Sequence, residues 1–89
     1  MRNQYRTDDI LISSYLLTKQ ARLVDITSDF QGHFIFIFED QSKCEGLARD
    51  YLNNGQVPAR ELFARREELI SQIRRRNGDR NNGRYREQR

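Results

Sequence analysis

Seven arginines cluster in residues 71–89 and give this sequence its clearest chemical signal. Only two carboxylates oppose them there, so this segment has a net charge of +5, whereas residues 1–70 have nine basic and eleven acidic side chains, a net charge of −2. Arginine neutralises phosphates and its planar group stacks on bases, so such segments often bind nucleic acid without reading its sequence. The predicted nucleic-acid-binding residues are Arg74, Arg75, Arg76, Arg80, Arg84, Tyr85, Arg86 and Arg89.

Two simpler interpretations of these arginines stand beside this one. Arg74, Arg75 and Arg76 follow an apolar helical pattern, and basic side chains at the end of a helix complement its dipole. The later arginines could serve only to keep the chain in solution. The negative charge of residues 1–70 also argues against a basic binding face on the folded part.

The residue types that most often carry catalysis are sparse. His33 is the single histidine and Cys44 the single cysteine, and a nucleophile and its base would need both in contact with a third, orienting group. Cys44 lies on an apolar helical stripe, which predicts a buried thiol, and the position of His33 beside a turn predicts a solvent-facing ring. We therefore expect no enzyme, no cofactor and no metal site. A lone cysteine also excludes an internal disulfide and fits a reducing, cytoplasmic setting.

Adjacent carboxylates occur at residues 8–9 and again at residues 39–40. Such pairs can bind metals or exchange protons, but both stand where helices are predicted to begin. Capping of the helix ends explains them without further chemistry. Glu67 and Glu68 are predicted to lie on the solvated face of the last helix.

The elements that position these residues are built around the stretch HFIFIFED, residues 33–40. Alternate side chains of a strand point to opposite faces, so its three phenylalanines share one face and its two isoleucines the other. A second β-rich run precedes it, and Gly32 lies in the short link between the two. We therefore predict a β-hairpin over Arg22 to Glu39.

Apolar residues at helical spacing predict three helices, at about residues 8–19, 42–52 and 58–76. Thr7 is the expected N-cap of the first helix, which is apolar around most of its circumference and should be buried on more than one side. The second helix is expected to open with a capping box formed by Ser42 and Glu45.

The order helix, strand, strand, helix, helix predicts a small α+β fold in which the hairpin packs on helices. We expect one domain over residues 1–76. Residues 77–89 contain no aliphatic side chain and predict a disordered basic tail. One shared core is predicted for Phe34, Phe36, Leu47, Tyr51, Leu62 and Phe63.

The small size of the chain favours association with a second copy. A domain of 89 residues buries only about 60% of its unfolded surface, and neither predicted strand contains proline or many charges to protect its edge. The face of Ile35 and Ile37, or a strand edge, could therefore meet its counterpart in a homodimer. In the alternative arrangement, the first helix covers the isoleucine face.

A characteristic pattern of apolar spacing and turns extends over roughly residues 7–73. It is formed by the stretches TDDILISSYLLTKQARLVDI, HFIFIFED and NNGQVPARELFARREELISQI. This pattern resembles domain of unknown function 5659, a family of short bacterial, archaeal and phage proteins. The resemblance implies a setting in phages and mobile elements. It does not imply any particular activity. The arginine-rich end lies outside it.

Two classes of function follow from these observations. The first is a small nucleic-acid-associated accessory protein of a phage or mobile element, which binds DNA or RNA without sequence preference through its arginines. The second is a protein-interaction module, structural or inhibitory, whose folded body docks on a partner protein. No membrane association is expected, because no stretch approaches the roughly 20 apolar residues of a membrane span.

Overall fold

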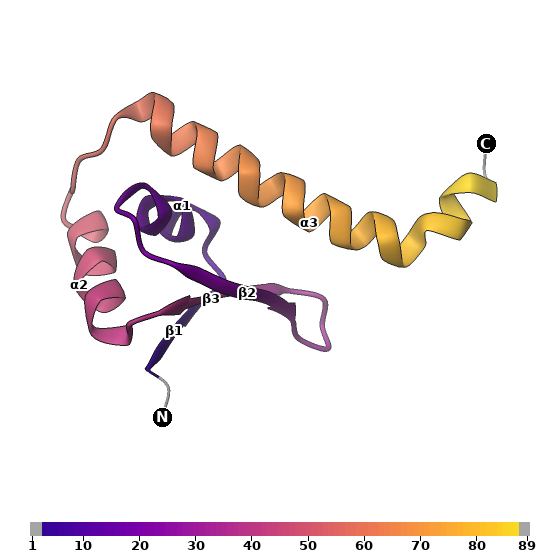
Figure 1. Cartoon of the computed structure of the whole chain (residues 1–89), viewed down its shortest axis with the longest axis horizontal. Helices are drawn as coiled ribbons and strands as arrows, with labels where there is room; N and C mark the ends of the chain where they lie inside the picture. The colour runs from indigo at the N-terminus through magenta and orange to yellow at the C-terminus, as the bar shows by residue number, and fades with distance from the viewer. Residues whose placement is uncertain (1–2, 88–89) are drawn as a thin grey trace.

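A three-stranded antiparallel sheet and three helices make up the structure (Figure 1), which confirms the predicted α+β fold. This computed structural model describes the backbone of residues 3–87 and the side chains of residues 3–75. The elements, in chain order, are β1 (Gln4–Thr7), α1 (Ile10–Thr18), β2 (Leu23–Ser28), β3 (Phe34–Glu39), α2 (Gln41–Leu52) and α3 (Ala59–Glu87). The predicted hairpin corresponds to β2 and β3.

The strand β1 is not predicted from the sequence. It pairs with β3, so the strand order is β1-β3-β2 and β3 lies in the centre of the sheet. Tyr5 stands opposite Phe38, and Thr7 stands opposite Phe36. Four residues with mostly polar side chains have no strand pattern of their own, and pairing with the central strand decides their conformation.

Helix α1 begins at Ile10, two residues later than predicted, because its N-cap is Asp9. The Asp9 carboxylate accepts hydrogen bonds from the backbone N–H groups of Leu11 at 2.8 Å and Ile12 at 3.1 Å. The expectation that Thr7 caps this helix is wrong. Thr7 ends β1, and its hydroxyl accepts a hydrogen bond from the Asp9 N–H at 3.1 Å.

Helix α2 is capped by Asp40, and the predicted capping box of Ser42 and Glu45 is wrong. Asp40 has a left-handed backbone with φ of 69°, and its carboxylate accepts the N–H of Lys43 at 3.2 Å. Aspartate enters this region more readily than most residue types, because its short polar side chain bonds locally. Glu45 instead accepts a hydrogen bond from the side-chain amide of Gln41 at 3.0 Å.

Helix α1 lies between the sheet and α3 (Figure 1), which confirms the prediction that it is buried on more than one side. Tyr15 and Leu16 are buried, as are Ser13 and Ser14. The two serine hydroxyls donate to backbone carbonyl oxygens one turn earlier, at 3.0 and 2.7 Å. Their burial therefore leaves no hydroxyl without a partner.

The phenylalanine face of the sheet is covered by all three helices. Phe36 and Phe38 are buried and cluster with Leu16 of α1, Cys44 of α2 and Leu69 of α3. Large apolar side chains from four elements thus meet in one core. The burial of this face and of the Cys44 thiol confirms the prediction from the sequence.

The predicted core list holds only in part. Phe34 and Leu47 are half-buried against the cluster, and Tyr51 and Leu62 are also half-buried. Phe63 is 61% exposed, so its assignment to the core is wrong. Helix α3 turns a neighbouring stripe inward, on which Leu69 is buried and Ile73 packs against the cluster.

The isoleucine face of the sheet is flanked by polar side chains of the neighbouring strands. Ile37 stands opposite Arg6 on one side and Asp25 on the other, and Ile35 stands opposite Thr27. Ile37 is only 6% exposed. The expectation that α1 covers this face is wrong, because α1 packs on the phenylalanine face.

The outer edge of β2 has a built-in protection against pairing. Its register with β3 shifts between Leu23 and Asp25, and the Asp25 carboxylate accepts the N–H of Ile26 at 2.8 Å. Bulges and locally occupied N–H groups both discourage a further strand from adding to an edge. The expectation of an undefended edge is therefore wrong for β2.

The backbone of α3 continues as a helix to Glu87, beyond the end predicted at Arg76. No proline interrupts residues 77–87, so the backbone can continue as a helix in spite of two glycines. Figure 1 shows this part of α3 extending past the sheet and the β2–β3 turn. The division into a domain of residues 1–76 and a tail of residues 77–89 stays a prediction.

Candidate functional site

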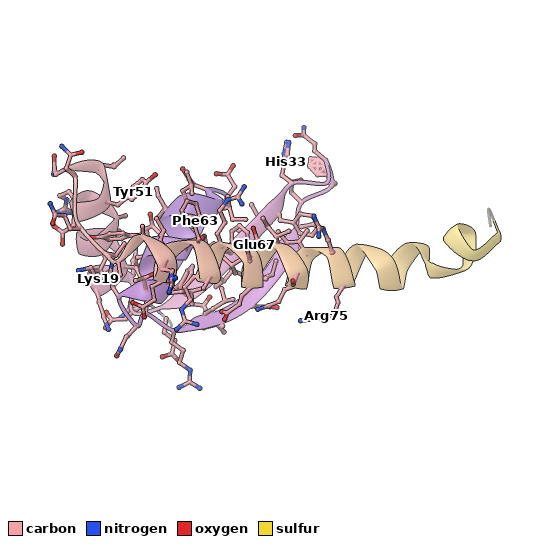
Figure 2. The ribbon with its side chains drawn as sticks, turned by 90° about the horizontal axis from the view of Figure 1, so that it is seen from above. Lys19, His33, Tyr51, Phe63, Glu67 and Arg75 are labelled. Atoms are coloured by element: carbon pink, nitrogen blue, oxygen red, sulfur yellow. The ribbon has the colours of Figure 1, made fainter. Side chains whose placement is uncertain are left out.

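Arg74 and Arg75 are the two predicted binding residues whose side chains the structure describes. Both are exposed, and Figure 2 shows the side chain of Arg75 pointing away from the rest of the fold. They directly follow Ile73, which packs against the core. Among the side chains of residues 3–75, no carboxylate forms an ion pair with either arginine. Outside the described side chains lie Arg76, Arg80, Arg84, Tyr85, Arg86 and Arg89.

Earlier on α3, arginines are neutralised by neighbouring glutamates. The Arg65 Nη1 atom donates to both carboxylate oxygens of Glu68, at 3.1 and 3.2 Å. The Arg66 Nη1 atom donates to Glu67 at 3.5 Å. Glu67 and Glu68 are exposed, as predicted. Charge along α3 is therefore compensated over residues 65–68, while the positive charge that begins at Arg74 has no described partner.

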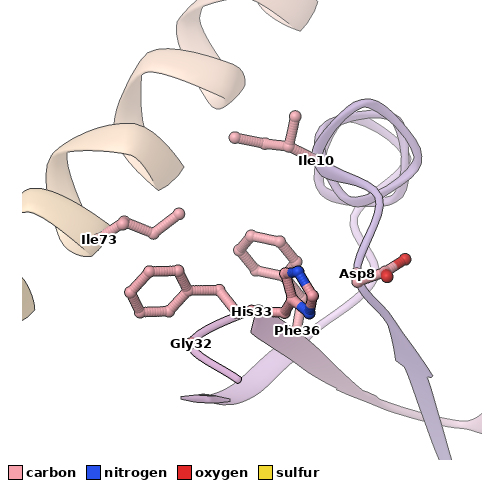
Figure 3. A pocket seen from close by; sticks show the side chains of 7 residues that line it. Asp8, Ile10, Gly32, His33, Phe36 and Ile73 are labelled. Carbon is pink, nitrogen blue, oxygen red and sulfur yellow. The ribbon is translucent and has the colours of Figure 1, made fainter. Parts of the chain in front are cut away.

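An apolar pocket of about 290 Å³ lies beside the start of this basic stretch (Figure 3). Its walls are Ile10 of α1, two phenylalanines of β3 and Ile73 of α3. Polar groups enter the lining only from Asp8 and from the β2–β3 turn. The full lining comprises Asp8, Ile10, Gly32, His33, Phe34, Phe36 and Ile73.

The β2–β3 turn that borders the pocket is fixed by hydrogen bonds to Asp29. The Asp29 carbonyl oxygen accepts the N–H of Gly32 at 3.0 Å, and the Asp29 N–H donates to the carbonyl oxygen of His33 at 3.0 Å. Gly32 has φ of 90°, which suits the left-handed position that closes a three-residue hairpin loop. The side chain of Phe30, at the tip, is 92% exposed.

The Asp29 carboxylate adds two further bonds, accepting the N–H groups of Gln31 and His33 at 2.9 Å each. Donation from the His33 N–H is the main reason why the pKa of Asp29 lies below its ordinary value. The Gln31 N–H and the His33 ring, whose Nδ1 atom is 3.5 Å from the carboxylate, lower this pKa further. The turn is thus held best when Asp29 is ionised.

His33 and Cys44, the single histidine and cysteine, are not placed for nucleophilic chemistry. Cys44 is fully buried, and its thiol donates to the Glu39 carbonyl oxygen at 3.3 Å. Burial raises the pKa of the Cys44 thiol, and the charge of Asp40 raises it further, which disfavours the thiolate. The His33 ring is exposed on the turn, as predicted. Within the described residues, no three His, Cys, Asp or Glu side chains are grouped to hold a metal ion.

Sequence reasoning did not identify the pocket or the exposed phenylalanine at the turn. The pocket joins the start of α1, the β2–β3 turn and α3, three segments that only the fold brings together. A partial signal was available in the motif DFQGH, residues 29–33. An aspartate and a glycine three positions apart are typical of a turn, and they place the intervening phenylalanine at its tip.

Comparisons of the chain with protein-family models, with curated proteins and with solved structures found no match. The resemblance to domain of unknown function 5659 therefore stays a prediction. Among the described residues, no helix combines the length and the apolar character that crossing a membrane requires.

Proposed function

We propose that this protein binds nucleic acid through the C-terminal part of α3, without reading base sequence. The observation that supports this function best is the exposure of Arg74 and Arg75 without a described carboxylate partner. Arg65 and Arg66, on the same helix, are paired with glutamates and do not offer free charge. An accessory role in a phage or mobile element is part of the proposal and rests on the family resemblance alone.

The shape of α3 supports contact with phosphates. Its backbone extends past the rest of the fold (Figure 1), so a nucleic acid can approach it without meeting the negatively charged body. Guanidinium groups bind phosphate oxygens through two parallel N–H bonds and do not lose their charge at any physiological pH. Contacts of this kind give affinity and leave base sequence unread.

Binding of the full chain to labelled single- and double-stranded DNA and RNA, measured by fluorescence anisotropy over a range of salt concentrations, tests the proposal. Three to five phosphate contacts predict a log–log slope of affinity against salt of about −2 to −4.5. Replacing Arg74 and Arg75 together by glutamine should reduce the steepness of this slope by about 1.4 to 1.8.

A matched control removes the same charge elsewhere. Arg49 on α2 and Arg60 near the start of α3 are also exposed. The double variant Arg49→Gln, Arg60→Gln should leave the salt slope nearly unchanged, because these residues lie away from the proposed site. Equal effects of the two double variants would show that only net charge matters, and would contradict a site on the C-terminal part of α3.

A truncation after Arg76 tests the remaining arginines. It removes four arginines together with Asp79 and Glu87, and no aliphatic side chain. The melting temperature should therefore hardly change, while the affinity for nucleic acid and its salt slope decrease. Binding that survives this truncation undiminished would place the site on the folded body.

Docking on a partner protein is the second candidate function, favoured by exposed apolar side chains on the body. Leu52 at the end of α2 is 70% exposed, and Phe63 on α3 is 61% exposed. Exposed aromatic side chains such as Phe63 are enriched at protein interfaces. If the intact chain fails to bind any nucleic acid at low salt, this candidate replaces the first.

A further inference from the structure

Phe30 is displayed at the tip of the β2–β3 turn with 92% of its surface exposed. Four hydrogen bonds between Asp29 and the residues after Phe30 hold the backbone of this turn. These bonds order the backbone from which the Phe30 side chain projects. A large apolar side chain on an ordered turn leaves less backbone freedom to be lost when it binds, which is typical of an interface anchor.

The apolar pocket lies on the same turn. Gly32 and His33, two and three residues after Phe30, contribute to its lining, and the remaining walls are mainly aliphatic and aromatic. Its volume of about 290 Å³ lies at the lower end of the roughly 300–1,000 Å³ of sites for small-molecule ligands. This volume and the apolar walls suit a single aromatic side chain.

We propose that two copies of this chain associate through their β2–β3 turns, with Phe30 of each copy inserted into the pocket of the other. Because Phe30 and two of the pocket-lining residues, Gly32 and His33, belong to one turn, a two-fold axis beside the turn can bring each anchor to the opposite pocket. Such an interface is self-complementary, as two-fold dimers require. It also leaves the protected edge of β2 unpaired.

The proposed contact is small. One aromatic side chain buries roughly 150–250 Å², so two reciprocal insertions give an interface below the roughly 1,200 Å² of stable complexes. The dimer should therefore be weak and should form progressively as the protein concentration rises. This inference concerns the turn alone and does not depend on nucleic-acid binding.

Sedimentation equilibrium of the full chain over a wide range of concentrations tests the proposal. A reversible monomer–dimer equilibrium is expected, and Phe30→Ala should weaken it by about 30-fold or more, as for a central anchor. Phe30 makes no core contact, so this variant should fold normally. Phe63→Ala is the matched control, because it removes an equally large exposed ring from α3 and should leave the dissociation constant within about 3-fold.

Chemical cross-linking tests whether the Phe30 ring lies in the pocket of the other copy. One chain carries Gln31→Cys, next to the anchor, and a second carries Asp8→Cys, on the pocket lining, while the native Cys44 thiol is buried. A short bis-maleimide should join the two different chains, and Phe30→Ala in both should abolish the product. A strictly monomeric chain, a dimer unaffected by Phe30→Ala, or cross-links only between two Gln31→Cys chains would each overturn the proposal.

Discussion

The hydroxyl of Tyr15 stands in the space that a side chain on Gly55 would need. A Cβ atom at Gly55 would also lie 2.8 Å from the Asp50 carbonyl oxygen. Tyr15 cannot easily move aside, because it is 2% exposed and its ring packs against Tyr51 with 5.5 Å between the centroids. The link between α2 and α3 is therefore pressed against α1, and only glycine fits there.

Gly55→Ala should lower the free energy of unfolding by about 1–3 kcal/mol, the usual cost of adding atoms to a packed site. Urea denaturation measures this change. Gly46→Ala is the control, since no atom lies within 4 Å of the added Cβ and residue 46 is in the interior of α2. There the same substitution should stabilise by about 0.5–1 kcal/mol through helix propensity. Equal effects at both positions would contradict the contact with Tyr15.

Asp9→Ala should destabilise the fold by about 0.5–2 kcal/mol, because it removes the carboxylate that accepts two N–H groups of α1. Asp8→Ala removes an identical charge one residue earlier and should have a much smaller effect, since no hydrogen bond to the first turn of α1 is lost. Thermal melting of the two variants separates capping from charge. A larger loss with Asp8→Ala would show that the cap is misassigned.

Phe36→Ala should cost about 3–5 kcal/mol, a large fraction of the stability of a small domain. Phe63→Ala should change the free energy of unfolding by well under 1 kcal/mol, because the ring is mostly in water. Urea denaturation of both variants measures the difference. An equal loss of unfolding free energy in the two variants would show that the stripe of α3 that contains Phe63 faces the core.

Acid should loosen the β2–β3 turn, and only below the ordinary pKa of an aspartate. Donation from the His33 N–H lowers the pKa of Asp29 in the folded chain, so ionised Asp29 contributes its full stabilisation above the ordinary value. This contribution is lost as the pH falls through the lowered pKa. An NMR titration of the Gln31 and His33 amide protons should give a midpoint below the ordinary aspartate pKa. A midpoint at or above it would contradict the hydrogen bonds to Asp29.

The central part of the fold could be predicted because its sequence signals are local. The alternating pattern of residues 34–38 fixes a strand with two faces, and Gly32 marks the turn before it. The burial of α1 follows from apolar residues around most of its circumference. These features need no knowledge of distant contacts.

Other features depend on contacts between distant segments. The strand β1 exists because Tyr5 and Thr7 pair with β3, and nothing within residues 4–7 specifies that partner. On α3, adjacent apolar residues at Leu62 and Phe63 allow two inward stripes, and packing against α1 and the sheet selects the one that contains Leu69. The candidate arginines could be found from composition. Which arginines of α3 have carboxylate partners could not, and only the structure shows that Arg65 and Arg66 are paired with glutamates.

The position of α1 between the sheet and α3 has a consequence for synthesis on the ribosome. A helix of nine residues is too short to persist alone in water, and the side of α1 that faces away from the sheet packs against α3. The core around Leu16 therefore cannot close until Leu69 has left the exit tunnel. Until α3 has emerged, the preceding segments stay incompletely packed, with the apolar helix α1 accessible to chaperones.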